Sequence, residues 1–528
     1  MKHRGEPVSR QLIQKTLWPD GHFVDFERSI NSAVRRLRQA LREKAGTPSY
    51  VETIARTGYR LIPPVTDDSA RNEIRAIAIL PLQDLSDSLD AQYFVDGLTD
   101  ALITEIALAS DLRVASRSSV LRYKDSSLGV RQTAKELNVQ VLVTGSIFRS
   151  GDRIRISLRL LDAAADRQFW KQTYDRDLKD ILLLQKEIAT AIVSSAATSI
   201  KQEVQPGTLR QINPKAYEFW LRGNFMFSMR FPGQVTNAAQ CYENAILLEP
   251  QWAPPYAMLA ECCRVLNFYD YPNSKQLVTR ANAMAAEALH LEPNNARANA
   301  VAGTLLAIHD WKWTEGEEKI KLALRWDPLC SQIEHDYSQV LLNWGRFDEA
   351  LRHADAALAI EPTSLVLWSH RAQILLFGRR FDDCLHESER LLEQFPGFAM
   401  GHVNYGAALI EAGRPAEALP HFEATFADTG MVIALFGIMH SHHELGRREE
   451  AQQGLDRLRQ MHREGLCSPA MLAWAHLTVG KIEEAFPLLE TALTERDTRL
   501  SLFVHLPQFD VIRADDRLIR VLRQINLL

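Results

Sequence analysis

Apolar residues recur at helical spacing close to the N-terminus of the chain. Separations of four, three and four residues predict one buried stripe on a helix over residues 28–41. The stripe consists of Ile30, Val34, Leu37 and Leu41. The next apolar positions, over residues 50–61, predict two short strands joined by a turn at Gly58.

Residues 74–200 alternate between strand and helix patterns. Helical periodicity begins at Asp96-Gly97, where a helix cap is expected. Strict alternation over residues 153–161 predicts a half-exposed hairpin strand after the turn at Gly151-Asp152. The other predicted strands cover residues 74–82, 112–116 and 140–148, and the other predicted helices cover 131–137 and 178–200. This order predicts an α/β sandwich.

Residues 214–528 are repetitive. Prolines recur at separations of 43, 35, 34 and 34 residues, and small residues recur at 34, 34, 33 and 34. The markers are Pro250, Pro293, Pro328, Pro362 and Pro396, and Ala350, Cys384, Ala418, Ala451 and Ala485. A 34-residue helix–turn–helix unit is the tetratricopeptide signature, and about eight units are expected. A glycine should end the first helix of each unit and a proline the second.

Positive charge is concentrated at the N-terminal end. Residues 1–65 contain 12 Lys and Arg against 6 Asp and Glu, whereas the whole chain has a formal net charge of -5. The rest of the chain therefore carries about -11. A basic end on an acidic body is typical of a nucleic-acid-binding head. A solvated basic helix face is the alternative interpretation.

The cysteine pattern and the hydropathy of the chain indicate the cellular compartment in which the protein is expected. The six cysteines include no CxxC pair, which favours free thiols in a reducing cytoplasm. No stretch reaches 18 apolar residues, so no membrane span is expected.

The N-terminal zone resembles the OmpR/PhoB-type winged helix, the effector domain of many bacterial response regulators. The matching residues are Val8-Ser-Arg-Gln-Leu12, Leu17-Trp18, Val24-Asp25, the helix over 28–41, Tyr50-Val-Glu-Thr-Ile54 and Thr57-Gly-Tyr-Arg-Leu61. The resemblance implies that the helix lies in the major groove of DNA and that the hairpin is a wing at the adjacent minor groove. The implied DNA contacts are Arg28, Asn31, Ser32, Arg35, Arg36 and Thr53, with Arg38 and Arg56 as secondary candidates.

The same resemblance implies binding partners, and it shows one difference between this chain and the family. Trp18 and residues 19–26 take the place of the family's polymerase-facing loop, so RNA polymerase is an expected partner beside double-stranded DNA. A homodimer is expected because one winged helix offers a small interface. Family members begin with a small sheet and a first helix, of which residues 1–7 match only the end. Either a late start codon or a truncated domain is expected.

Residues 74–200 resemble the TolB-like domain found between bacterial DNA-binding or cyclase domains and tetratricopeptide repeats. The matching residues include Ile77-Ala-Ile-Leu-Pro81, Tyr93-Phe94, Gly145-Ser146 and Tyr174-Asp-Arg-Asp-Leu178. The expected fold class is multidomain α+β. It comprises a partial winged helix (1–65), an α/β TolB-like domain (74–200) and an all-α tetratricopeptide solenoid (214–528).

No catalytic, cofactor or metal site is predicted. The chain has no GxxxxGK[ST], GxSxG or strand-linked GxGxxG motif. His440, His442 and His443 beside Glu444 lack the HExxH spacing of a zinc site and are expected on a solvated face.

The favoured hypothesis is a cytoplasmic bacterial transcriptional regulator. Its winged helix would bind promoter DNA, and its repeats would bind a protein or peptide partner in a concave groove. The alternative is a tetratricopeptide scaffold or adaptor with a vestigial DNA-binding head. An enzyme, the third class, would need an unrecognised site within residues 74–200.

Overall fold

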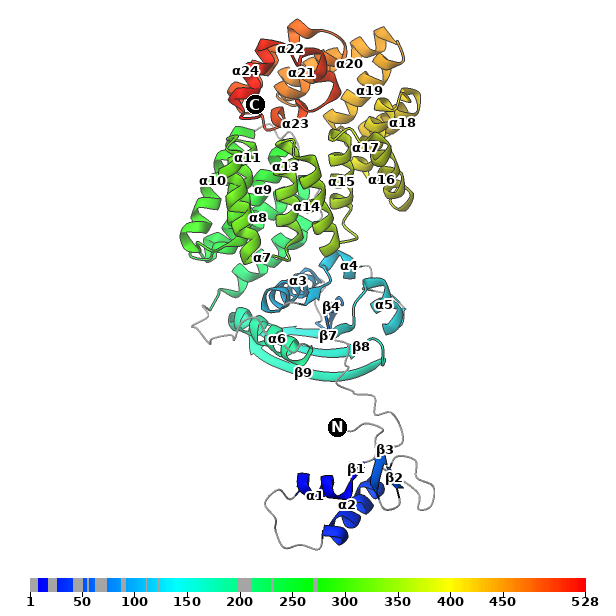
Figure 1. Ribbon diagram of the computed structural model, residues 1–528. Coiled ribbons are helices and arrows are strands. Elements are labelled where there is room, and N and C mark those ends of the chain that lie inside the picture. The colour runs from blue at the N-terminus through cyan, green and yellow to red at the C-terminus, as the bar shows by residue number, and fades with distance from the viewer. Residues whose placement is uncertain are drawn as a thin grey trace. The chain divides into compact units, whose positions relative to one another are not determined.

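The computed structural model divides the chain into two units, Met1–Glu73 and Ile74–Leu528 (Figure 1). The structure describes residues 8–17, 26–40, 51–54, 57–61, 74–86, 92–110, 112–121, 123–124, 126, 128–196, 211–228, 232–268 and 274–528. Within these ranges, no helix is long and apolar enough to cross a membrane.

The N-terminal unit combines helices with a three-stranded antiparallel sheet of order β1-β3-β2. Its described elements are β1 (Val8–Ser9), α1 (Arg10–Leu17), α2 (Phe26–Ala40), β2 (Val51–Ile54) and β3 (Gly58–Leu61). The predicted helix and strand pair are both present. The short strand β1, which pairs with β3, was not predicted.

The described residues of this unit include one cluster of buried apolar side chains. Ile30, Val51 and Tyr59 are buried, and Ile13 and Val34 pack against them. The predicted stripe is wrong at Leu37, which is 45% exposed, because the described core covers only the Ile30 and Val34 turns of α2. Leu41 lies outside the described residues.

Gly58 is a strand residue and not the turn that the sequence predicted. It opens β3 and pairs with Ser9 on one side and Ile54 on the other. A Cβ atom at this position would overlap the Val8 carbonyl oxygen, and its φ of +155° is rare for residues with side chains. Only glycine lets β1 approach β3 this closely.

The first part of the second unit is a mixed sheet of order β6-β4-β7-β8-β9, with β5 also pairing to β7. The strands are β4 (Ala76–Ile79), β5 (Gln83–Asp84), β6 (Arg113–Val114), β7 (Val141–Ser150), β8 (Arg153–Asp162) and β9 (Arg167–Asp177). The helices are α3 (Gln92–Ala109), α4 (Arg117–Leu121), α5 (Val130–Leu137) and α6 (Ile181–Ala196), the last preceded by the 3-10 turn η2 (Leu178–Asp180). β4, β6 and β7 are parallel, whereas β8 and β9 are antiparallel to their neighbours.

The predicted alternation in β8 is confirmed, because Ile154, Ile156, Leu158 and Leu160 are all fully buried. The sequence missed β9, since Tyr174 is its one buried residue and the strand lies at the sheet edge. The cap predicted at Asp96-Gly97 is wrong. Both residues lie inside α3, where Asp96 is buried and accepts hydrogen bonds from Lys124 at 3.2 Å.

The sheet domain and the first repeat share one core. Gly97 of α3 faces Leu221, and Tyr217 accepts a hydrogen bond from Gln185 of α6. The rings of Trp220 and Trp252 lie 5.5 Å apart at this junction. The three sequence-based domain boundaries stay predictions.

Helices α7 to α22 form eight consecutive pairs in the described part of the chain, which confirms the predicted repeats (Figure 1). The pairs are α7 (Pro214–Ser228) with α8 (Pro232–Leu248), α9 (Ala253–Phe268) with α10 (Ser274–Leu291), α11 (Ala296–Ile308) with α12 (Trp313–Trp326), α13 (Ser331–Asn343) with α14 (Phe347–Ile360), α15 (Leu365–Phe377) with α16 (Phe381–Gln394), α17 (Ala399–Glu411) with α18 (Pro415–Thr429), α19 (Val432–Glu444) with α20 (Arg448–Arg463), and α21 (Pro469–Thr478) with α22 (Ile482–Glu495). The marker residues Ala350, Cys384, Ala418, Ala451 and Ala485 are all buried.

Glycine and proline mark the helix ends as predicted. Gly345, Gly413, Gly446 and Gly480 follow first helices with φ between +72° and +79°, a left-handed conformation that glycine adopts without strain. Pro362 lies two residues beyond the end of α14, where it cannot continue a helix.

We expect Gly58→Ala to destabilise the N-terminal unit by roughly 1–3 kcal/mol, because the added Cβ separates β1 from β3. Native-state proteolysis of the full chain measures this as cleavage within residues 1–73 that is faster by about 5- to 150-fold. The matched control is Gly129→Ala, where a Cβ meets no neighbour. Equal cleavage rates for the two variants would contradict the packing described here.

Candidate nucleic-acid and partner interfaces

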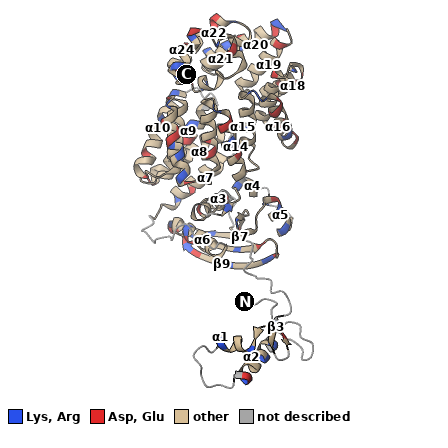
Figure 2. Ribbon diagram, in the orientation of Figure 1, with Lys and Arg blue, Asp and Glu red and all other residues tan. Residues whose placement is uncertain are grey.

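The outer face of α2 carries a stripe of polar and basic residues. Arg28, Ser32 and Arg35 are four and three residues apart, so they share the side of the helix opposite Ile30. Arg28 and Arg35 are exposed, and Ser32 is half-buried. Arg36 is also exposed at the flank of this stripe. Figure 2 shows the basic positions along α2 in blue.

Asn31 and Tyr59 join the helix to the sheet. The Tyr59 hydroxyl donates to Asn31 Oδ1 at 2.8 Å, so this face of Asn31 is already engaged. Arg10 donates to the Tyr59 hydroxyl at 3.1 Å, stacks over the Tyr59 ring and forms an ion pair with Glu27. These contacts fix α2 against β3.

Arg38 joins the same helix to the neighbouring strand. Its Nη2 donates to the Val51 carbonyl at 2.7 Å and to Thr53 Oγ1 at 2.9 Å. Two of the predicted DNA contacts, Arg38 and Thr53, thus bind each other. Arg38 acts as a positioning residue that sets the angle between α2 and the hairpin.

The structure brings only some of the predicted DNA-contacting residues together on one surface. Arg35 and Arg36 have no ion-pair partner among the residues described, so their charges remain available. Arg56 and the polymerase-facing positions Trp18 and 19–25 lie outside the described residues. Sequence reasoning missed the network of Arg10 and Tyr59. The inward position of Tyr59 in β3, alternate to Arg60, is the signal that could have revealed it.

A buried ionic cluster links the first helices of three repeats. Arg264 of α9 donates to Glu261 at 2.8 Å and to Asp336 of α13 at 2.9 Å, and Arg297 of α11 lies 3.5 Å from Asp336. Both carboxylates are fully buried. Burial alone would raise the pKa of Asp336, but the Arg264 charge and a His335 hydrogen bond outweigh it and hold this pKa below its usual range.

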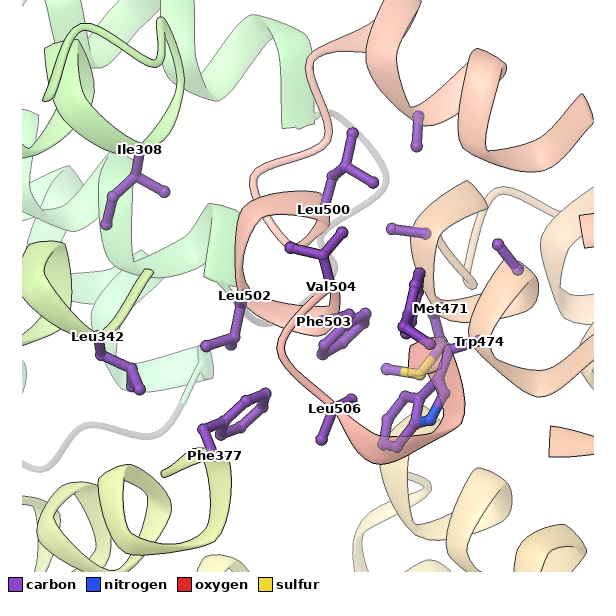
Figure 3. Close-up of a cluster of buried hydrophobic side chains, with 14 of the residues drawn as sticks. Ile308, Leu342, Phe377, Met471, Trp474, Leu500, Leu502, Phe503, Val504 and Leu506 are labelled. Atoms are coloured by element: carbon purple, nitrogen blue, oxygen red, sulfur yellow. The ribbon is translucent and has the colours of Figure 1, made fainter. Parts of the chain in front are cut away.

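The C-terminal residues pack against the middle repeats (Figure 3). Leu500, Phe503 and Leu506 are buried in one cluster with Leu342 and Phe377, the ends of first helices α13 and α15. The segment contains α23 (Leu500–Phe503), η3 (Pro507–Ile512) and α24 (Asp516–Gln524).

Polar contacts reinforce this closure of the solenoid. Trp313 Nε1 donates to the Ile525 carbonyl at 2.8 Å, and Arg379 donates to Asp510 at 2.7 Å. The C-terminal segment therefore covers one edge of the repeats.

The histidine group of α19 differs from expectation. His440 is buried, its ring is tilted against Phe436 with centroids 5.6 Å apart, and its Nε2 lies 3.6 Å from Glu444 Oε1. The solvated face predicted for it is wrong, because this side of α19 packs inside the repeat. No group of three or more His, Cys, Asp or Glu suited to a metal ion occurs among the described positions.

The chain is similar to two families of transcriptional regulators. Residues 1–61 match the family described as "Transcriptional regulatory protein, C terminal". Residues 73–191 match "HilA/YgeH-like transcriptional regulator, second domain". The N-terminal unit is a winged-helix domain of the regulator type, as the sequence predicted. The TolB-like resemblance of the next domain stays a prediction.

One relative of this chain is named as a cyclase and another as a transcriptional regulator. Putative adenylate cyclase 3 of Rhizobium meliloti is 26% identical over 262 residues, which covers 49% of this chain and 42% of the relative. Transcriptional regulator HilA of Salmonella typhimurium is 22% identical over 397 residues, covering 74% and 69%. The chain thus spans less than half of the first relative and about two thirds of the second.

Two solved structures resemble parts of the chain. A thermophilic TPR protein of Thermus thermophilus is 20% identical with a TM-score of 0.32, covering 37% of this chain and 99% of that one. The type IV pilus biogenesis factor PilW is 16% identical with a TM-score of 0.32, covering 41% and 94%. The helix pairs of the chain itself define its repeat architecture.

We expect Asp336→Asn to lower the stability of the second unit by roughly 3–5 kcal/mol, because it removes the buried carboxylate that the half-buried Arg264 and Arg297 share. Urea unfolding of the full chain, followed by circular dichroism, measures the shift in midpoint. The control Asp355→Asn removes an exposed partner of Arg371 and should cost less than about 1 kcal/mol.

The effect of Asp336→Asn should depend on pH. A carboxyl whose folded pKa is depressed stabilises the fold above its unfolded pKa of about 3.9 and loses that contribution as the pH falls. The gap between the wild type and Asp336→Asn should therefore shrink below about pH 4. A gap that widens in acid would contradict the ionic role of Asp336.

Proposed function

We propose that the chain is a DNA-binding transcriptional regulator. The observation that carries this proposal is the exposed stripe of Arg28, Ser32 and Arg35, presented on a helix whose other side is tied to a hairpin. The regulator-type family match over residues 1–61 supports the same conclusion.

In the proposed complex, α2 lies in the major groove of promoter DNA. Arg28 and Arg35 are suited to guanine edges, and Asn31 and Ser32 offer further polar contacts. Arg36 faces the phosphate backbone, where a cation contributes salt-dependent affinity. Thr53 and Arg56 belong to the wing, and Arg38 aligns the wing with α2.

The remaining parts supply partners rather than catalysis. The first helices of the repeats bind a protein or peptide, away from the edge that the C-terminal segment covers. RNA polymerase is a further partner of the N-terminal unit, and the chain acts as a homodimer in the bacterial cytoplasm, where its promoter DNA lies. No residue is assigned a catalytic role, although one relative carries the name of a cyclase.

Arg35→Ala should weaken binding to DNA from the promoter of the chain's own operon by roughly 5- to 150-fold, which corresponds to about 1–3 kcal/mol for a lost base contact. Fluorescence anisotropy with a labelled duplex measures the affinity at fixed salt. The matched control is Arg131→Ala on α5, which removes an equally exposed charge from the other unit and should leave binding unchanged. Equal affinities for wild type, Arg35→Ala and Arg131→Ala would favour the adaptor with a vestigial head.

Arg38→Ala should weaken DNA binding in a different way. Loss of its bonds to Val51 and Thr53 loosens α2 against the wing, so affinity falls while the dependence of affinity on salt keeps its slope. Arg36→Ala, in contrast, should reduce that slope by about one. Salt titrations of both variants separate the two roles. A reduced slope for Arg38→Ala would mean that Arg38 contacts phosphate directly.

A further inference from the structure

One edge of the mixed sheet is open. β9 ends the strand order, and no strand in the described part of the chain pairs with its outer side. A register shift interrupts its pairing with β8 between Leu160 and Leu161, and from Trp170 to Asp177 the ladder is regular. A regular strand with a free edge presents unpaired backbone N–H and C=O groups, which form a template for another strand.

Two positive charges lie opposite one another on the exposed face of β8 and β9. Lys171 lies directly opposite Arg159 of β8, and both side chains are exposed. Neither has an ion-pair partner among the described residues. Like charges directly opposite one another destabilise a strand pair. A carboxylate beyond the edge, next to Lys171, would remove this penalty.

β9 itself has a carboxylate on the same face, Asp175, four residues after Lys171. Asp175 accepts from Arg155 at 2.8 Å and also pairs with Arg153. Positive charge at Lys171 and negative charge at Asp175 therefore flank Thr173 symmetrically on one side of the strand. A second copy of β9, rotated by 180° about an axis at Thr173, would therefore place its negative charge opposite Lys171 and its positive charge opposite Asp175.

We propose that a second copy of this chain pairs its β9 with this edge, antiparallel, about a two-fold axis at Thr173. A two-fold axis normal to the sheet keeps each face on its own side and centres the pairing on one residue. Lys171 then lies opposite the partner subunit's Asp175, and Asp175 lies opposite the partner subunit's Lys171. On the helix-covered face, Trp170 meets the partner subunit's Arg176 in a cation–π contact.

Charge excludes one neighbouring register, and the length of the strand excludes the other. Centring on Gln172 would place Lys171 opposite the partner subunit's Thr173, and the repulsion from Arg159 would persist. Centring on Tyr174 would also give Lys171 a carboxylate, the partner subunit's Asp177, but it would place Trp170 opposite the partner subunit's Leu178, which lies beyond the strand. Centring on Thr173 pairs residues 170–176, all within the regular ladder.

This surface goes beyond the proposed DNA binding, because it assigns the homodimer to a defined strand edge. Each dimer carries two N-terminal units. The association is measured on the full chain without DNA, so its failure would leave the proposed DNA binding untouched.

Thr173→Cys tests the axis directly. Opposite residues in antiparallel strands have Cβ atoms about 4.5–5.5 Å apart, close to the separation that a disulfide spans. Mild oxidation should therefore convert most of Thr173→Cys into a covalent dimer on a non-reducing gel. In the control Gln168→Cys, the two copies of the exposed position lie roughly 33 Å apart along the strands, so little dimer is expected. The native cysteines are all buried or partly buried, which keeps the background low.

Lys171→Asp tests the charge pairing. It sets two carboxylates opposite each other in each half of the interface, so the dimer dissociation constant measured by sedimentation velocity should rise at least tenfold. Lys171→Arg should retain the dimer, and Lys135→Asp, on exposed α5, should leave it unchanged. Melting curves confirm that each variant is folded.

The outcomes decide the proposal. A wild-type chain that is monomeric up to about 100 μM, a range in which stable homodimers are populated, would overturn it. So would cross-linking of Thr173→Cys no faster than Gln168→Cys, or a dimer that Lys171→Asp leaves intact.

Discussion

The position of α2 depends on a few polar contacts between it and the sheet. Among the described residues, the apolar cluster beneath the helix comprises Ile30, Val51 and Tyr59, with Ile13 and Val34 beside them. Apolar packing is non-directional, whereas a hydrogen bond is restricted in angle. The Tyr59–Asn31 hydrogen bond and the Arg38 contacts with β2 therefore set the direction in which Arg28 and Arg35 point. Every functional role proposed for the N-terminal unit requires these contacts.

The second unit is built on a different principle. Five of the eight described helix pairs bury a small marker residue. The core of the mixed sheet continues through Tyr217 and Trp252 into the repeats. The C-terminal segment then packs back on the ends of α13 and α15. A solenoid closed in this way is held by contacts far apart in sequence, and the Arg264–Asp336 cluster adds a charged link between repeats. Its stiffness would give a bound partner a fixed surface.

Features that recur at a regular spacing could be predicted from the sequence. The repeats follow from spacings of 33 to 34 residues, and β8 follows from alternation between Arg153 and Leu160. The helix α2 follows from its apolar stripe, although Leu37 is exposed. The basic face of α2 was likewise visible, because exposure opposite an apolar stripe is a local property.

Features that depend on distant partners could not be predicted. β9 lacks an apolar period because it is an edge, and nothing in the sequence around Asp96 indicates that its partner is Lys124. Arg38 looks like any exposed arginine until β2 is placed beside it. The packing of Leu500 and Phe503 against Phe377 arises only when the solenoid closes.

The central claim is that the exposed arginines of α2 bind DNA phosphates and bases. The salt dependence of affinity for promoter DNA, measured with the full wild-type chain, tests this claim most directly. The phosphate contact proposed for Arg36 gives a slope of log affinity against log salt of about -1 per N-terminal unit. That slope, or a steeper one from two units, is the predicted result. Binding that does not change with salt, or no binding at low salt, would contradict the account.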